Sequence, residues 1–184
     1  ATLINVDLSN ANLVAADLRD ADLRGANVGG ANLEGSDFTG SNVDGVDFSK
    51  SNIAGAKIVL SMSSLADDIQ RIIASHRLWA ESQGRDGARA ELAGRDLSLI
   101  NFSGIDFSGA NFENCNMAGA NFSGALMVMA NVAGADLSGC NFENAVLDGV
   151  NFARANIVGA NLRGAKIGAV EIKRPDGTSP ATIL

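Results

Sequence analysis

The chain has few of the residues on which most catalytic, metal-binding and disulfide-stabilised sites depend. Its 184 residues include one histidine, two cysteines, two prolines and no tyrosine, and aromatic residues make up only 5%. The single histidine has no second histidine with which to share a metal, and the cysteines lack a Cys-x-x-Cys spacing. The sequence therefore predicts no metal, no cofactor and no disulfide framework, and a core of small and aliphatic side chains.

Long apolar runs and clusters of positive charge are also missing. No stretch approaches the roughly 20 apolar residues of a membrane-spanning helix, and no charged and apolar leader opens the chain. The expectation is a cytoplasmic protein that does not contact a membrane. A net charge of −7 disfavours nucleic-acid binding, because phosphate contacts need clustered lysine and arginine.

What the sequence does have is a repeat with a period of five residues. From Leu3 to Ile58 an aliphatic or phenylalanine residue recurs at every fifth position, which makes twelve units. A second series, in a different register, runs from Leu92 to Ile167 and makes sixteen units. A small residue, usually Ala or Ser, stands two places before most of the large ones, and Asp or Asn usually stands one place before them. The consensus is Ala-[Asp/Asn]-Leu-x-x.

Neither a helix nor an extended strand satisfies a five-residue repeat, because their side-chain periods are 3.6 and 2. A chain that turns a corner every five residues does satisfy it. The small and the large residue of each unit then point inward, and the polar residue between them faces out, where Asp and Asn stabilise turns by bonding to nearby backbone. We therefore expect an all-β solenoid with a continuous aliphatic interior.

The consensus and its long uninterrupted series resemble the pentapeptide-repeat family. The resemblance implies a right-handed quadrilateral β-helix with four units per coil, here of about seven coils with one α-helical insertion between coils three and four. The expected domains are about three coils in 1–60, a helical insertion and loop in 61–91, about four coils in 92–172 and a capping tail in 173–184. Stacking at twenty-residue intervals predicts a core column formed by Phe102, Phe122, Phe142 and Leu162.

The insertion loses the five-residue period and has a helical pattern. Ser64 and Asp67 resemble a capping box, apolar residues follow at spacings that mark one helical face, and Gly84 is a stop signal. We expect an amphipathic helix over 64–82. Part of this segment also resembles a lead-in that precedes repeat blocks in other bacterial family members, namely His76, Trp79, Gly87, Arg89 and Leu92.

One wall of the second series breaks the rule that outward positions are polar. Its apolar residues are Leu126, Val128, Met129 and Val146, joined by Val59 and Leu60 if the coils continue in phase. We expect the helix to lie along this wall and to shield Trp79. The alternative is that the wall and the helix, with His76 and Trp79, are presented to a partner protein, as exposed apolar patches often are.

The remaining residues give little indication of catalysis, metal binding or reactive thiols. Cys115 and Cys140 occupy small inward positions and are expected to be buried free thiols. His76 has serines within sequence range, but nothing marks a converging base, nucleophile and acid, so no catalytic residue is predicted. The rows of Asp match no calcium-binding motif and are better explained as turn-stabilising side chains.

Two functions remain open at the level of sequence. The first is a non-enzymatic rigid scaffold for protein–protein interaction with an unknown partner. The second, which the resemblance implies for some family members, is an acidic DNA mimic that binds a type II topoisomerase such as DNA gyrase. Duplex DNA carries about 20 charges over the expected rod length of about 34 Å, against a net charge of −7 here, which favours the scaffold. Nothing visible covers the first coil, and this open end also leaves a homodimer possible.

Overall fold

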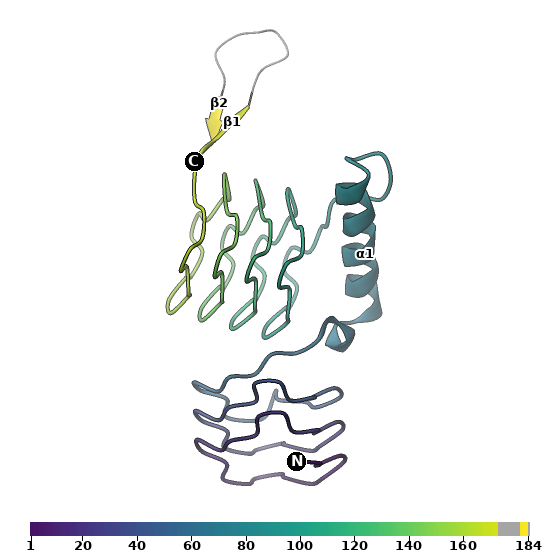
Figure 1. Cartoon of the computed structure of the whole chain (residues 1–184), viewed down its shortest axis with the longest axis vertical. Helices are drawn as coiled ribbons and strands as arrows, with labels where there is room; N and C mark the ends of the chain where they lie inside the picture. Colours follow the sequence, from purple (N-terminus) through teal and green to yellow (C-terminus); the bar gives the residue numbers. More distant parts are fainter. Residues whose placement is uncertain (173–180, 184) are drawn as a thin grey trace. The chain divides into compact units, whose positions relative to one another are not determined.

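A computed structural model describes residues 1–172 and 181–183 of the chain (Figure 1). The chain divides into two compact units, Ala1–Ser64 and Leu65–Leu184, each with its own coils. The capping tail predicted for 173–184 falls largely outside the described residues, so its role stays a prediction.

Few residues of the described chain form regular helices or strands. The named elements are a 3-10 turn η1 (Met62–Ser64), the helix α1 (Asp67–Glu81) and the strands β1 (Val170–Ile172) and β2 (Ala181–Ile183). The two strands are antiparallel, with Val170 opposite Ile183. Most of the other described residues belong to the coils of the solenoid.

The coils repeat every twenty residues and pair through single parallel bridges. In the second unit Asn131 pairs with Asn111 of the preceding coil and with Asn151 of the following coil. Backbone hydrogen bonds make these contacts, such as the one from Leu92 N to Asn111 O at 2.8 Å. The first unit pairs in the same way. Bridges recur at five-residue steps along the chain, so each coil of the second unit has four sides.

The corners between the sides need a left-handed backbone. The last residue of most five-residue units has a positive φ, and glycine is the commonest residue there, because it adopts this conformation without a steric cost. Where a larger residue takes the corner, its side chain lies over the corner of the next coil. Asn114 (φ 56°) covers Gly134 in this way, and a Cβ atom on Gly134 would overlap the Asn114 amide. Gly134 is therefore held to glycine by sterics.

The large inward residues fill the interior of each coil. In the second unit the four large residues of the first coil, from Leu92 to Phe107, are 0% exposed. At the last coil Ile157 is 46% and Ile167 60% exposed. The first coil of this unit is therefore covered, and the last coil leaves apolar side chains at the surface.

Three members of the predicted core column stack on one another. The ring of Phe122 lies 5.2 Å from that of Phe102 and 5.3 Å from that of Phe142, with interplanar angles of 30° and 13°. All three rings are buried, whereas Leu162 in the last coil is only partly so.

The helix α1 begins three residues later than the capping box indicated. Its first residue is Asp67, and its N-cap Ala66 makes no side-chain capping bond. Ser64 instead ends the 3-10 turn, so the prediction of a capping box is wrong. Gly84 follows the end of α1, as expected. Its backbone is left-handed, with a φ of 85°, and its N–H donates to Trp79 O in the last turn of the helix at 2.8 Å.

The helix α1 covers the first coil of the second unit (Figure 1). The ring of His76 stacks on that of Phe107, an inward residue of this coil, at 5.8 Å and 12°. Arg95, also in the first coil, forms an ion pair with Asp68 in the first turn of α1 at 2.9 Å.

The prediction that the helix lies along the apolar wall is therefore wrong. Leu126 and Met129 of that wall stay 40% and 39% exposed, and the contacts of α1 go to the end of the coil stack. The physical reason is that an end coil exposes both its apolar interior and a row of backbone groups, which need cover. The backbone of a side wall is already paired between coils. Val59 and Leu60, which were expected to join this wall, belong to the first unit and not to the second.

Candidate functional site

The four predicted wall residues lie on one side of the second unit's coils. Leu126 bridges Asp106 in the preceding coil and Val146 in the following coil. Leu126 and Met129 are exposed, and Val128 and Val146 are partly exposed. We call these four residues, Leu126, Val128, Met129 and Val146, the apolar wall.

Met129 occupies a corner of its coil, where its backbone has a φ of 58°. Its side chain lies over Gly149, where a Cβ atom would be 3.4 Å from Met129 Cγ and 3.3 Å from Val170 Cβ. Glycine at this corner therefore leaves room for both side chains. Val170, the first residue of β1, extends the apolar wall at this corner. The repeat pattern does not include Val170, because Val170 lies beyond the last repeat.

The other three walls carry polar ladders that are satisfied within the coils. On one wall Asn121 Nδ2 donates to Asn101 Oδ1 at 3.0 Å, and Asn141 Nδ2 donates to Asn121 Oδ1 at 3.2 Å. The same Oδ1 of Asn121 accepts from Ser123 N–H at 3.1 Å. Similar ladders of Asn with Asp or Glu run along the remaining two walls. The apolar wall replaces the ladder with Leu126 and Val146.

His76 and Trp79, the other two predicted surface residues, belong to the contact between α1 and the first coil. His76 is 1% exposed, and its Nδ1 accepts a hydrogen bond from Ala90 N–H at 3.1 Å. Its ring stacks on that of Trp79 at 5.6 Å as well as on Phe107. The prediction of His76 as a surface residue is wrong, and Trp79 is partly buried.

The lead-in residues gather around this contact. A Cβ atom on Gly87 would lie 2.9 Å from Trp79 N and would overlap the carbonyl oxygen of Ser75, so the loop packs directly on the backbone of α1. A Cβ atom on Gly109 would lie 3.4 Å from Arg89 Cδ and 4.0 Å from Trp79 Cη2. The lead-in thus builds a cover for the coil that follows it.

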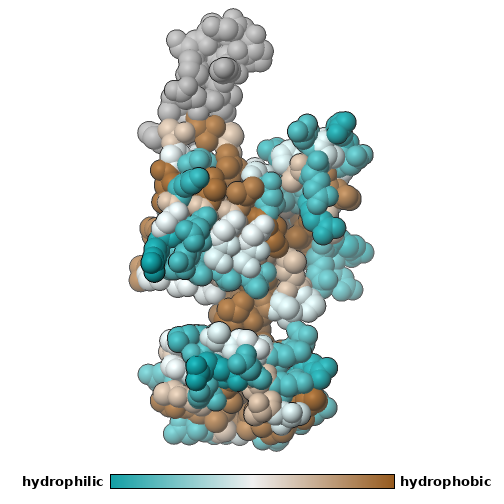
Figure 2. Space-filling view, in the orientation of Figure 1, coloured by the Kyte–Doolittle hydropathy of each residue, from teal (hydrophilic) through white to brown (hydrophobic). Residues whose placement is uncertain are grey.

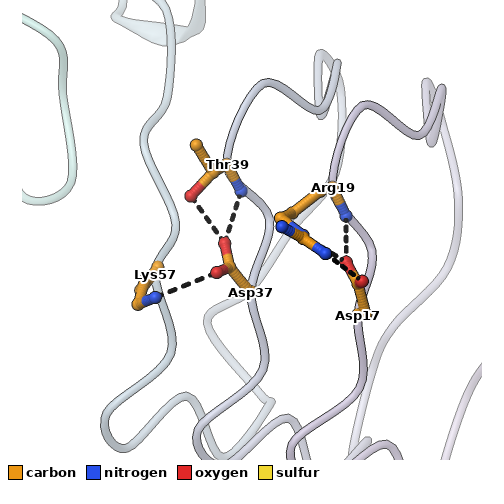
Figure 3. Close-up of polar contacts among 5 residues, drawn as sticks. All are labelled: Asp17, Arg19, Asp37, Thr39 and Lys57. Carbon is orange, nitrogen blue, oxygen red and sulfur yellow. Dashed lines mark hydrogen bonds and ion pairs between the residues drawn. The ribbon is translucent and has the colours of Figure 1, made fainter.

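The first unit carries a row of ion pairs on one wall (Figure 3). Arg19 pairs with Asp17 at 2.6 Å, and Lys57 pairs with Asp37 at 2.9 Å. Hydrogen bonds from Arg19 lower the pKa of Asp17 to about 2. Hydrogen bonds from Thr39 and then from Lys57 lower the pKa of Asp37. The acidic residues of this wall are therefore largely neutralised by bases on the same wall.

We expect the first unit to lose stability in acid over a window set by these carboxylates. Because folding lowers their pKa, their stabilising contribution is present above about pH 3.9 and is lost as the pH falls through the folded value, which for Asp17 is about 2. In hydrogen exchange, peptides of the first unit should lose protection as the pH falls from 4 to 2. This loss should be smaller in Asp37→Asn than in the wild-type chain. Glu34→Gln is the control, and an unchanged acid response in Asp37→Asn contradicts the expectation.

The two cysteines are buried free thiols. Cys115 Sγ donates to Leu92 O and Cys140 Sγ donates to Met117 O, both at 2.9 Å. Burial raises the pKa of both thiols, and that of Cys140 to about 12. The reactive thiolate form is therefore scarce at neutral pH.

Residues 1–172 and 181–183 lack metal-binding clusters and membrane-spanning helices. They contain no group of three His, Cys, Asp or Glu side chains that could hold a metal ion. In this same part of the chain, no helix has the length and apolar character needed to cross a membrane.

The coils, ladders and glycine corners define the class of protein, a β-solenoid whose sides are five residues long. The pentapeptide-repeat family model matches in eight copies, over residues 1–40, 16–55, 88–124 and 127–164. The chain belongs to the pentapeptide-repeat family, whose members generally serve as scaffolds.

Solved pentapeptide repeat proteins are similar to the chain at low identity. HetL, involved in heterocyst differentiation regulation in the cyanobacterium Nostoc sp. strain PCC 7120, is 23% identical over 97% of this chain and 91% of its own, with a TM-score of 0.32. A thylakoid lumen protein of Arabidopsis thaliana is 24% identical over 72% and 61%, with a TM-score of 0.30. QnrB1, a plasmid-mediated fluoroquinolone resistance protein, is 18% identical over 85% and 64%, with a TM-score of 0.30. No curated protein matches the sequence.

Proposed function

We propose that the chain is a non-enzymatic scaffold whose apolar wall binds a protein partner. The observation that carries the proposal is the exposure of Leu126 and Met129 on a wall with no polar ladder. Figure 2 shows that apolar surface interrupts the polar surface of the second unit. Since the wall's backbone is fixed by bonds to both neighbouring coils, binding orders little of it and costs little entropy.

The surroundings of the apolar wall resemble those of a protein interface, with an apolar centre and a polar rim. Asp106 precedes Leu126 in the bridged column, and Lys166 follows Val146. Charged groups of both signs thus border the wall. This arrangement supports a partner with its own apolar patch and a mixed polar rim.

A variant that rebuilds the consensus tests the wall. Leu126→Asn with Val146→Asn places ladder residues between Asp106 and Lys166, so the fold should persist while the apolar centre is lost. In affinity capture from a cell extract, a partner recovered with the wild-type chain should fall at least tenfold with this double variant. Val158→Ser, which replaces a residue that is 75% exposed on a different wall, is the matched control.

Equal recovery of the partner by the double variant would remove the wall as the binding site. These point variants are sharper than deletion of 62–90, because the deletion also uncovers Phe107 and the rest of the first coil of the second unit. Circular dichroism of each variant checks that the coils persist.

The competing function, a DNA mimic directed at a type II topoisomerase, has less support. Several acidic residues of the first unit lie in ion pairs, Asp17 with Arg19, Asp22 with Arg24 and Asp37 with Lys57. Duplex DNA instead presents one charge per about 1.7 Å. A gyrase supercoiling assay distinguishes the two functions. Inhibition or drug protection at sub-micromolar concentration would favour mimicry, and no effect would favour the scaffold.

Self-association through a solenoid end is a second proposal, supported by the exposed Ile157 and Ile167 of the last coil. An apolar coil end is favourable to cover with a second copy of the chain. Size-exclusion chromatography with light scattering should then give a dimer for the wild-type chain and a monomer for Ile167→Asp. A monomeric wild-type chain would contradict this proposal and leave the apolar wall unaffected.

A further inference from the structure

The contact between α1 and the first coil of the second unit depends on one imidazole. His76 is the only histidine of the chain and is almost completely buried. Its Nδ1 accepts the Ala90 N–H, so the neutral ring carries its proton on Nε2. Among the described residues, His76 Nε2 has no hydrogen-bond partner. The ring therefore fits this site as a neutral acceptor.

Two aromatic rings stack on the His76 ring. Trp79 lies on one side at 5.6 Å and 15°, and Phe107 of the first coil stacks at 5.8 Å and 12°. The ring thus joins a residue of α1 to a residue of the solenoid interior. An imidazole in this place is shut off from the water that would solvate a charge.

Two charged residues face His76 and act in opposite directions. Asp106 of the first coil favours the protonated ring through its carboxylate, and Arg89 of the loop after α1 opposes it. A nearby indole face also favours a cation to a modest degree. Burial is the strongest influence, and its net effect is to lower the pKa of His76.

We propose that protonation of His76 releases α1 from the first coil, which makes the helix a cap that opens in mild acid. A proton on Nδ1 removes the acceptor for Ala90 N–H and sets two donors against each other. It also places a charge on a ring that is almost completely buried against two aromatic rings, which is unfavourable. Release exposes Phe107 and the end of the coil stack as a new apolar surface.

The direction of the pH dependence follows from proton linkage. A released imidazole has the ordinary pKa of about 6.5, and the docked ring has a lower one. Above about pH 6.5 both states are neutral and docking is strongest. As the pH falls below this value, the released state takes up a proton that the docked state does not, until the pH drops below the docked pKa. Over this range the equilibrium constant for release of α1 rises about tenfold for each pKa unit by which docking lowers the pKa of His76.

The full chain can report on release directly, because Trp79 is its only tryptophan. Between pH 7.5 and 5.0 the Trp79 emission should shift to longer wavelengths. Hydrogen exchange, corrected for the intrinsic effect of pH, should show lost protection in 67–81 and retained protection in 110–150. Release of the cap is thereby separated from unfolding of the coils.

Two variants test the role of the imidazole, one at His76 and one as a control. His76→Gln keeps an amide oxygen that can accept from Ala90 N–H and does not titrate, so its α1 protection should be flat from pH 7.5 to 5.0. Asp136→Asn removes a second-unit carboxylate whose pKa is lowered by Ser138, and it should respond to acid like the wild-type chain.

Proton NMR titration of the single histidine keeps the test independent of how any variant folds. A pKa below 6.5 together with acid-dependent loss of α1 protection supports the proposal. A pKa at or above 6.5 overturns it, as does protection of α1 that persists to pH 5.0. An acid response in His76→Gln equal to that of the wild-type chain overturns it as well.

Discussion

Phe122→Ala is expected to lower the free energy of unfolding of the second unit by about 3–5 kcal/mol. Phe122 is 0% exposed and stacks between Phe102 and Phe142. It also meets Phe107 and Phe112 edge to face, at 6.3 and 6.4 Å. The loss combines the transfer of a large apolar ring with a cavity that neighbours cannot close, because hydrogen bonds fix the coils on both sides.

Leu162→Ala in the same column is the matched control. Leu162 belongs to the last coil and is only partly buried, so its truncation should cost about 1–2 kcal/mol. Urea unfolding followed by circular dichroism and by Trp79 fluorescence measures both variants. Equal losses for Phe122→Ala and Leu162→Ala would mean that depth in the column does not set stability, contrary to this account.

The core column could be predicted because the five-residue period is strict and the resemblance to the family supplied four units per coil. Phe102, Phe122 and Phe142 are spaced by twenty residues, and four five-residue sides return the chain to the same wall. The apolar wall followed from the same arithmetic, since Leu126 and Val146 are also twenty residues apart. Wherever the repeat holds, the number of a residue predicts the wall and the coil on which it lies.

The site of α1 could not be predicted, because no period connects the insertion to the coils. A signal was nevertheless present in the first coil of the second unit. Arg95, Ile100 and Ile105 occupy positions where the consensus has a small residue. Arg95 reaches Asp68 of α1, and Ile100 is 3% exposed. Long side chains fit at these positions because no preceding coil crowds this end.

The misplacement of His76 has a similar cause. Ile69, Ile73 and His76 are spaced by four and three residues, which sets them on one helical stripe, and all three are buried. His76 had been offered, with Trp79, as part of the surface that the helix and wall present to a partner protein. Its position on the apolar stripe was the better guide, because a neutral imidazole with one satisfied nitrogen can be buried.

The second large effect is expected at Gly87, where the loop after α1 packs on the helix. Its backbone is left-handed, with a φ of 73°, and an added Cβ would overlap Ser75 O and lie 2.9 Å from Trp79 N. These are backbone atoms of α1 and cannot move aside singly. Gly87→Ala should therefore cost about 2–5 kcal/mol, as the sum of left-handed strain and overpacking.

Gly94→Ala separates these two contributions. Gly94 has a φ of 71°, but no atom lies within 4 Å of an added Cβ, so only the strain of about 1–2 kcal/mol should remain. Urea unfolding followed by Trp79 fluorescence compares the two variants. Similar losses would contradict the packing of the loop on α1. Because both glycines share the same backbone conformation, any excess loss in Gly87→Ala measures the contact that holds the loop, and with it Trp79, against the first coil of the second unit.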